Sequence, residues 1–339
     1  MKTAGTKIFT KVSGWVRAKK TSEENSQPMD NEAADLVEET KVCSSKDCLS
    51  NPNHRPSIIL SDENNPWFMI GGSVTGHGHK IDNSPCQDSH KIEQWVNGWG
   101  VAVVSDGAGS AANSHIASSF LTEETARRAA LLVKRENWIE NNLFPEEGEW
   151  RELSKKLFNS IQDSLIGYSI GINSTLGSLH ATLILIIYSP YGLLVAHVGD
   201  GRAGCLTKND EWSSIINPFE GDQVGETAFM TLDLESNEDY FESNVINEPV
   251  KAFFALTDGC ERVCWETLKK DPETGRFIKP NKPFEQFFLQ TIEGLQTQSK
   301  SDKSEDLKNK WIDYLDSGHK GFRTETDDKT MVIGIMVNE

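Results

Sequence analysis

The sequence predicts an α+β fold in which two antiparallel β-sheets pack against each other and helices cover their outer faces. Short apolar runs bounded by turn residues have the pattern of antiparallel strands. Two blocks of helical periodicity interrupt these strands, one near residues 114–168 and one near 261–315. The strands are therefore expected to form the two inner layers of an α/β/β/α sandwich, starting at residue 66.

Each expected element depends on a local pattern. Helix 114–135 carries apolar residues on one side, and helix 150–168 repeats leucine or isoleucine at every fourth position. Segments 180–188 and 193–198 are joined by Ser-Pro-Tyr-Gly, which predicts a hairpin. The other expected strands are 67–70, 98–105, 202–206, 250–256 and 331–337, and the other expected helices are 261–268, 283–295 and 303–315. The polar stretch 207–249 is either a flap over a site or an ordinary surface excursion.

Composition narrows the class of protein. The chain has 339 residues, with 51 acidic and 34 basic side chains, and its formal charge of −17 argues against a general nucleic-acid binder. No apolar run approaches the roughly 20 residues that cross a bilayer, and the first residues lack the features of a signal peptide. Six cysteines fit free thiols better than a disulfide framework. A cytoplasmic protein with no transmembrane segment is expected.

Residues 1–65 are expected to be an N-terminal extension, either disordered or a linker, ahead of a catalytic domain at 66–339. Residues 1–20 hold six Lys or Arg and no acid. They form either a basic amphipathic helix for a membrane surface or partner, or a solvated tail. Cys43, Cys48 and His54 offer zinc-type ligands, but their spacing is not that of a standard zinc motif.

An apolar strand that ends in Asp-Gly occurs three times and points to a site. These runs place Asp106, Asp200 and Asp258 at strand ends, and Asp327-Asp328 precedes the last apolar run. Any single Asp-Gly is an ordinary turn signal. Carboxylates that converge without a cation would repel one another, so convergence would require hard divalent ions such as Mg²⁺ or Mn²⁺.

The order of the motifs resembles the metal-dependent Ser/Thr protein phosphatases of the protein phosphatase 2C (PPM) family. It is most similar to a compact bacterial branch whose first motif is Ser-His…Pro-Cys-Gln-Asp. The matching segments are Gly78-His79, Pro85-Cys86-Gln87-Asp88, Ser105-Asp106-Gly107-Ala108-Gly109-Ser110, Ala181-Thr182, Gly199-Asp200-Gly201, Leu256-Thr257-Asp258-Gly259 and Asp327-Asp328-Lys329-Thr330. Together they run from about residue 69 to 337.

The resemblance implies a site with two Mg²⁺ or Mn²⁺ ions. Asp106 would bridge the ions, with the Gly107 carbonyl also on one of them, and Asp258 and Asp327 would complete the protein ligands. Gln87 stands where the family usually has a Glu ligand, and this loss of charge predicts weaker binding of one ion.

Two further aspartates have roles implied by the same resemblance. Asp88 would hold water bound to the ions, and Asp200 would help to bind a third, weaker ion. The ions would activate a shared water against the phosphorus of phosphoserine or phosphothreonine, which assigns catalytic roles to Asp106 and Asp258. Cys86 is better explained by packing than as a nucleophile.

Two departures from the family pattern concern the substrate side of the site. Ala108 replaces a histidine that serves many eukaryotic members as an acid. The proton for the leaving group would then come from metal-bound water or from another group, with His79 the nearest candidate in the sequence. The phosphate-binding Arg of those members has no counterpart at the usual spacing, so His79 or Lys80 is expected to contact the phosphate. A structural role for His79 is the alternative.

Three functions compete. The leading hypothesis is metal-dependent hydrolysis of phosphoserine and phosphothreonine in proteins, opposing a bacterial Ser/Thr kinase, with the phosphoprotein and the kinase as partners. The second is a pseudophosphatase that binds a phosphoprotein as a regulatory module, which the metal-ligand aspartates oppose and Ala108 favours. The third keeps the hydrolase but changes the substrate to a small phosphorylated metabolite.

Overall fold

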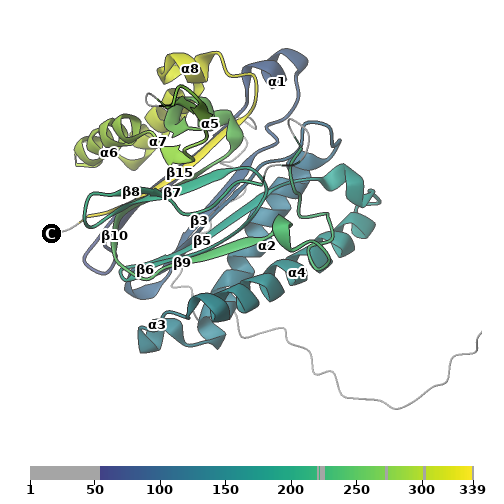
Figure 1. Ribbon diagram of the computed structural model, residues 1–339, viewed down its shortest axis with the longest axis horizontal. Coiled ribbons are helices and arrows are strands. Elements are labelled where there is room, and N and C mark those ends of the chain that lie inside the picture. Colours follow the sequence, from purple (N-terminus) through teal and green to yellow (C-terminus); the bar gives the residue numbers. More distant parts are fainter. Residues whose placement is uncertain (1–53, 220, 222–225, 272–273, 301–302, 338–339) are drawn as a thin grey trace, which may run out of the picture. The chain divides into compact units, whose positions relative to one another are not determined.

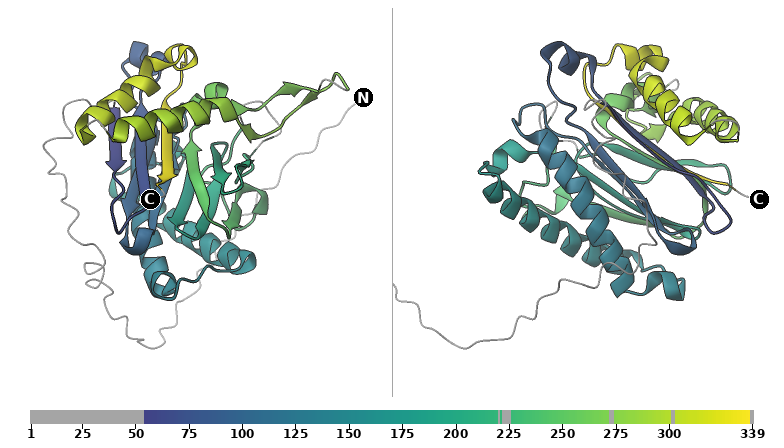
Figure 2. Two further views of the ribbon diagram at one scale, coloured as in Figure 1. Left: turned by 90° about the vertical axis from the view of Figure 1, so that its left-hand side faces the viewer. Right: turned by 180° about the vertical axis from the view of Figure 1, so that it is seen from behind.

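The computed structural model describes residues 54–219, 221, 226–271, 274–300 and 303–337. Its architecture is the predicted one: two antiparallel sheets face each other, with helices on both outer sides (Figures 1 and 2). Most of the expected N-terminal extension, including Cys43 and Cys48, lies outside the described residues. No helix in the described ranges is both long and apolar enough to cross a membrane.

The first sheet has five strands in the order β3-β4-β5-β6-β9. These strands are β3 Ser89–Gln94, β4 Gly100–Ser105, β5 Leu183–Ser189, β6 Gly192–Val198 and β9 Glu242–Ile246. Two long helices, α2 Ser114–Arg135 and α4 Glu147–Gly171, cover its outer face (Figure 1). Val101 and Val103 of β4 point toward these helices, whereas Ala102 and Val104 point toward the other sheet.

The second sheet has six strands in the order β1-β2-β15-β10-β7-β8. They are β1 His54–Ile59, β2 Trp67–Val74, β7 Arg202–Thr207, β8 Trp212–Ser214, β10 Val250–Leu256 and β15 Lys329–Met336. Helices α5 Asp258–Cys264, α6 Glu285–Ser299, α7 Ser304–Asp313 and α8 Lys320–Arg323 pack on its outer face. Smaller elements are α1 His77–Asp82, α3 Trp138–Asn141, and the two-stranded pairs β11 Trp265–Glu266 with β14 Lys282–Pro283 and β12 Lys269–Lys270 with β13 Phe277–Ile278.

The core between the sheets explains why the strands are continuous apolar runs. Trp67 of β2 packs edge-on against Tyr188 and Phe253, with ring centroids 5.5 and 5.3 Å away. Because helices bury the other face of each sheet, both sides of the central strands avoid water. Each sheet contributes one row of side chains to this central layer, and the loops at the strand ends are held in fixed relative positions.

Three details correct the sequence-based expectations. Strand β1 lies inside the range expected to be a linker, and it pairs with β2 over its whole length, so the fold begins before residue 66. The helix expected at 261–268 ends at Cys264, where the chain turns into β11. Helix α1 and strands β3 and β9 have short or mixed patterns that did not stand out as elements.

Candidate active site

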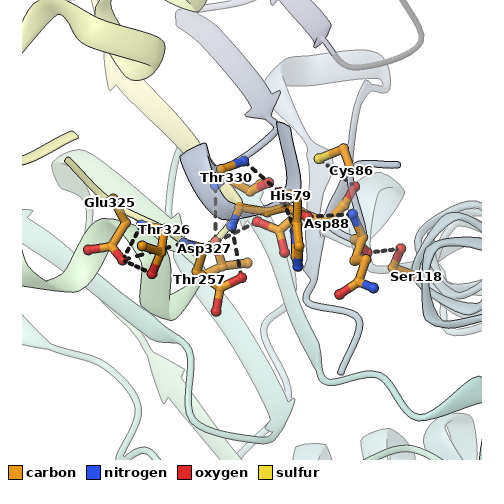
Figure 3. Close-up of polar contacts among 12 residues, drawn as sticks. His79, Cys86, Asp88, Ser118, Thr257, Glu325, Thr326, Asp327 and Thr330 are labelled. Atoms are coloured by element: carbon orange, nitrogen blue, oxygen red, sulfur yellow. Dashed lines mark hydrogen bonds and ion pairs between the residues drawn. The ribbon is translucent and has the colours of Figure 1, made fainter. Parts of the chain in front are cut away.

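Aspartates from both sheets gather at one edge of the sandwich. Asp106 follows β4 and Asp88 precedes β3, and since these strands are antiparallel neighbours, the two residues lie at the same edge. In the other sheet, Asp258 follows β10 and Asp327 lies just before β15, which is also an antiparallel neighbour. Asp200 follows β6. The turn at each strand end thus brings a carboxyl group to this edge, and Figure 3 shows two of them, those of Asp88 and Asp327.

Burial and mutual repulsion shift the pKa values of these carboxyl groups. Burial raises the pKa of Asp106 well above its ordinary value, and the charges of Asp88, Asp258, Asp327 and Asp200 raise it further. Burial, then the charges of Asp327 and Asp200, raises the pKa of Asp258 to about 7, although a hydrogen bond with Asp106 opposes the shift. The five carboxyl groups therefore repel one another and favour protonation unless a cation is present.

Several buried oxygen atoms at this edge have no hydrogen-bond partner among the described residues. They are Oδ1 of Asp88, Oδ1 of Asp258 and Oε1 of Gln87. A buried acceptor without a donor is costly, and carboxylate and amide oxygens are the ligands that Mg²⁺ and Mn²⁺ prefer. Among the described residues, no three His, Cys, Asp or Glu side chains are arranged to hold a metal ion together. The donor chemistry of the site nevertheless fits a divalent cation.

The loop after β4 is tightly packed around Gly107. A Cβ atom on this glycine would lie 2.7 Å from the Gln87 carbonyl oxygen and 2.8 Å from atoms of Ser114, so no side chain fits there. The neighbouring Asp106 exchanges hydrogen bonds with Thr182, whose Oγ1 accepts from the Asp106 N–H at 3.0 Å. The Ala181-Thr182 motif therefore fixes the backbone that carries Asp106.

Asp328, not its neighbour Asp327, organises the loop of the first motif. The buried Asp328 carboxylate accepts hydrogen bonds from the backbone N–H groups of Gly76 at 2.7 Å and Gln87 at 2.5 Å. It also accepts from Nδ1 of His79 at 2.9 Å. Asp328 thus orients the ring of His79 and gives this histidine a structural contact. The contact uses Nδ1 and does not involve Nε2.

Lys80, the other residue expected to contact substrate, forms an ion pair with Asp316 in the turn after α7. The structure thus gives its ammonium group a partner outside the group of five aspartates. Cys86 is buried, its Sγ faces the Asp88 carbonyl oxygen, and burial raises the pKa of its thiol well above the ordinary value. A protonated, enclosed thiol is a poor nucleophile, in agreement with a packing role.

A chain of buried hydrogen bonds leads from Asp88 across the space between the sheets. Oγ1 of Thr257 donates to Oδ2 of Asp88 at 2.8 Å and accepts from the Thr330 N–H at 3.0 Å. Oγ1 of Thr330 donates to Ser73 at 2.8 Å, and Ser73 bonds Nδ1 of His90 at 2.8 Å. The three hydroxyl groups and the carboxylate are buried, and Figure 3 shows Asp88, Thr257 and Thr330. The chain fixes one oxygen of Asp88 and leaves the other available to the site.

The chain ends at strand β1. Nε2 of His90 bonds Oγ of Ser57 at 2.7 Å, and burial, followed by the charges of Arg55 and Lys91, lowers the pKa of His90 to about 3. His90 is therefore neutral near pH 7. In the sequence, Thr257 and Asp328 stand out only as parts of motifs. Their roles could not be predicted, because the sequence does not show which way a hydroxyl group or the second of two aspartates points.

Part of the stretch 207–249 packs against the loops of the site. The Phe219 N–H donates to the Gly199 carbonyl at 2.7 Å, next to Asp200. The Met230 N–H donates to the Ala181 carbonyl at 2.9 Å. This stretch is therefore hydrogen-bonded to the loop that carries Asp200 and to the segment before β5, where Thr182 bonds Asp106.

Comparisons of the sequence and of the fold with known proteins gave matches. A sequence profile for protein phosphatase 2C matches residues 75–311. A bacterial serine phosphatase carrying a point mutation aligns with a TM-score of 0.50 at 13% identity, over 80% of this chain and 98% of that chain. The serine/threonine phosphatase Stp1 from Staphylococcus aureus aligns with a TM-score of 0.47 at 14% identity, over 82% of this chain and 97% of that chain. A search of curated proteins found no match.

Proposed function

Because the chain belongs to the protein phosphatase 2C family, we propose that it hydrolyses phosphoserine and phosphothreonine in proteins with the help of Mg²⁺ or Mn²⁺. The observation that carries this proposal is the contact between Asp106 and Asp258, which come from different sheets. The charge of Asp258 adds to burial in raising the pKa of Asp106, and a bound cation would offset this repulsion. Such a cluster has a clear use in phosphoryl chemistry, where bound divalent ions activate water and neutralise charge on the phosphoryl oxygens.

The proposed metal ligands are the side chains of Asp106, Asp258 and Asp327 and the carbonyl group of Gly107. Together they would hold two ions. Asp88 would orient water through Oδ1, the atom that has no protein partner. Gln87 would contribute its amide oxygen, which is also buried and unpaired. A third, weaker ion would bind near Asp200.

His79, in the first motif, is the residue proposed to act on the substrate side of the site. Ala108 has no ionisable side chain, so His79 is the proposed donor of a proton to the departing serine or threonine oxygen, acting through Nε2. Its contact with Asp328 would keep the ring in one orientation. Lys80 would contact the phosphoprotein substrate only after leaving its ion pair with Asp316.

The proposed setting is the cytoplasm, where the enzyme would oppose a bacterial Ser/Thr kinase. The basic residues 1–20 are proposed to contact a membrane surface or a partner. A small phosphorylated metabolite is the alternative substrate, and a panel of phosphomonoesters tested beside a phosphothreonine peptide would separate the two.

The experiment that tests the proposal is release of phosphate from a phosphothreonine peptide in millimolar Mn²⁺. We expect turnover by the wild-type chain and a loss of at least a hundredfold in Asp106→Asn, with weaker Mn²⁺ binding in calorimetry. Asp163→Asn is the matched control, because Asp163 is exposed on α4. A wild-type chain that binds Mn²⁺ and the phosphopeptide without releasing phosphate would instead be a pseudophosphatase.

A further inference from the structure

A small polar cavity lies beside the aspartate cluster. It has a volume of about 150 Å³ and is lined by Arg202, Asn217, Pro218, Thr267, Lys279 and Asn281. These residues come from the start of β7, the segment after β8 and the loops around the β12–β13 hairpin. The lining contains two cationic side chains and no acidic one, although acids outnumber bases 51 to 34 in the whole chain. The cavity is thus a local basic site on an acidic protein.

The guanidinium of Arg202 is held in a fixed position at this cavity. Arg202 is only 8% exposed. Its Nε donates to Glu261 at 3.0 Å and its Nη1 donates to Oδ1 of Asn281 at 2.9 Å. Neither of these bonds uses Nη2, and among the described residues this nitrogen stays available to a molecule in the cavity. A guanidinium that is already ordered loses little conformational entropy when it binds an anion.

Asn281 is itself fixed by its neighbours. Its Oδ1 also accepts from Nε1 of Trp265 at 2.9 Å, and its Nδ2 donates to the Ile216 carbonyl at 3.1 Å. Asn281 adopts a positive φ of 44°, a conformation that asparagine tolerates better than most residues. The wall of the cavity is therefore built from a connected set of hydrogen bonds that joins three segments of the chain.

The cavity is close to the aspartates. Arg202 follows Asp200 by two residues, so their Cα atoms are at most about 8 Å apart. Its partner Glu261 lies in α5, one turn after Asp258 at the start of that helix. The Arg202–Glu261 ion pair therefore links the two loops that carry these site carboxyl groups.

We propose that this cavity binds an anionic side chain of the phosphoprotein substrate, a carboxylate or a second phosphate near the residue that is dephosphorylated. Arg202 and Lys279 supply the charge, and the fixed amide of Asn281 and the hydroxyl of Thr267 supply further hydrogen bonds. An extended peptide advances about 3.3 Å per residue, so an acidic side chain two to four residues from the phosphorylated one reaches the cavity. The inference rests on the proposed phosphatase activity.

The test compares two phosphothreonine peptides that differ only in flanking residues, glutamate in one and glutamine in the other. We expect a KM about tenfold lower for the glutamate peptide, with a similar kcat, because the contact is made before and during the reaction alike. Lys279→Glu is expected to remove this preference. Lys208→Glu is the control, since Lys208 is exposed just beyond the far end of β7, roughly 20 Å from Arg202 along the strand.

Equal KM values for the two peptides in the wild-type protein, or equal loss of the preference in both lysine variants, would overturn the inference. Turnover of the glutamine peptide tests the phosphatase activity separately. If neither peptide is hydrolysed, calorimetry with the unphosphorylated glutamate peptide and metal-free protein decides: binding that Lys279→Glu abolishes supports the cavity. Binding of inorganic phosphate alone, with no peptide binding, would show a site for a free anion and overturn the substrate role.

Discussion

Nδ1 of His79 donates a hydrogen bond of 2.9 Å to Oδ1 of Asp328, across 249 residues of sequence. The same carboxylate also holds the backbone at Gly76 and Gln87. One buried side chain directly before the last strand thus shapes the loop that carries the first motif. Adjacent Asp327 has its own environment nearer the other site carboxyl groups, so two neighbouring aspartates have separate tasks.

Substitutions at this pair should separate the two tasks. Asp328→Asn places an amide group where a carboxylate accepts three hydrogen bonds, and we expect the free energy of unfolding to fall by about 2–4 kcal/mol. Asp327→Asn removes a charge from a repelling cluster, so the metal-free protein should keep its Tm while Mn²⁺ binding and turnover fall. Calorimetric unfolding in EDTA measures the first effect. Equal Tm values for the two variants would contradict this assignment.

The metal-free protein should lose stability as pH rises above 6.5. The pKa of Asp258 is about 7 in the folded protein and 3.8 ordinarily, so between these values the folded state binds more protons than the unfolded state. The stabilisation is complete below about pH 4 and is lost as pH rises through 7. His90 and His197, whose pKa values are lowered to about 3 and 4, act in the opposite direction only below about pH 6.5.

Thermal unfolding between pH 6.5 and 8.5 in EDTA measures this effect. The slope of Tm against pH should be negative, and it should be smaller in Asp258→Asn. Saturating Mn²⁺ should raise Tm most at the upper end of this pH range, because the ion binds the ionised carboxylates. At a concentration one hundred times Kd, the ion should raise the free energy of unfolding by about 2.7 kcal/mol. A Tm that does not change with pH in EDTA would show that repulsion among the aspartates does not destabilise the metal-free protein.

The hydroxyl of Thr257 should matter for metal binding more than for folding. Thr257→Val removes the bond to Oδ2 of Asp88 and should weaken Mn²⁺ binding and turnover by 10- to 100-fold, as expected when an orienting contact is lost. Thr257→Ser keeps the hydroxyl and should restore both. Thr125→Val is the control, because the buried Thr125 hydroxyl has no partner among the described residues. Calorimetry with Mn²⁺ gives a readout that does not depend on turnover.

The fold should tolerate removal of residues 1–53 but not of residues 1–60. Strand β1 covers the edge of β2 and carries Ser57, which bonds the buried ring of His90. A chain that starts at residue 54 should keep its Tm and its phosphopeptide turnover. A chain that starts at residue 61 should unfold at lower temperature and aggregate through the exposed strand edge. Equal Tm values and equal turnover for the two truncated chains would show that β1 does not belong to the part of the protein that unfolds cooperatively.

The layers of the fold could be predicted because their physical signals are local. Helix 114–135 was placed with the bounds that the structure has, since its apolar side repeats at helical spacing. Strands ending at Asp106 and Asp258 were visible because a carboxyl group after a long apolar run is unusual. The gathering of these carboxyl groups was inferred only by adding the family resemblance to this pattern. Their metal-binding roles stay predictions.

The remaining features depend on contacts between distant segments. β1 was missed because its sequence, His-Arg-Pro-Ser-Ile-Ile, mixes polar residues with a proline, as an edge strand can. The role of Asp328 depends on which of two adjacent side chains turns inward when β15 pairs with β2. Likewise, the basic cavity at Arg202 needs three segments that only the folded chain brings together.

The place of β15 in its sheet has a consequence for biosynthesis. This strand, residues 329–336, lies between β2 and β10, so the centre of the six-stranded sheet is incomplete until that segment has left the ribosome. Domains generally fold as units during synthesis. The nascent chain would thus stay without a working catalytic centre while its earlier strands emerge, and it would gain one only when its late segment inserts between them.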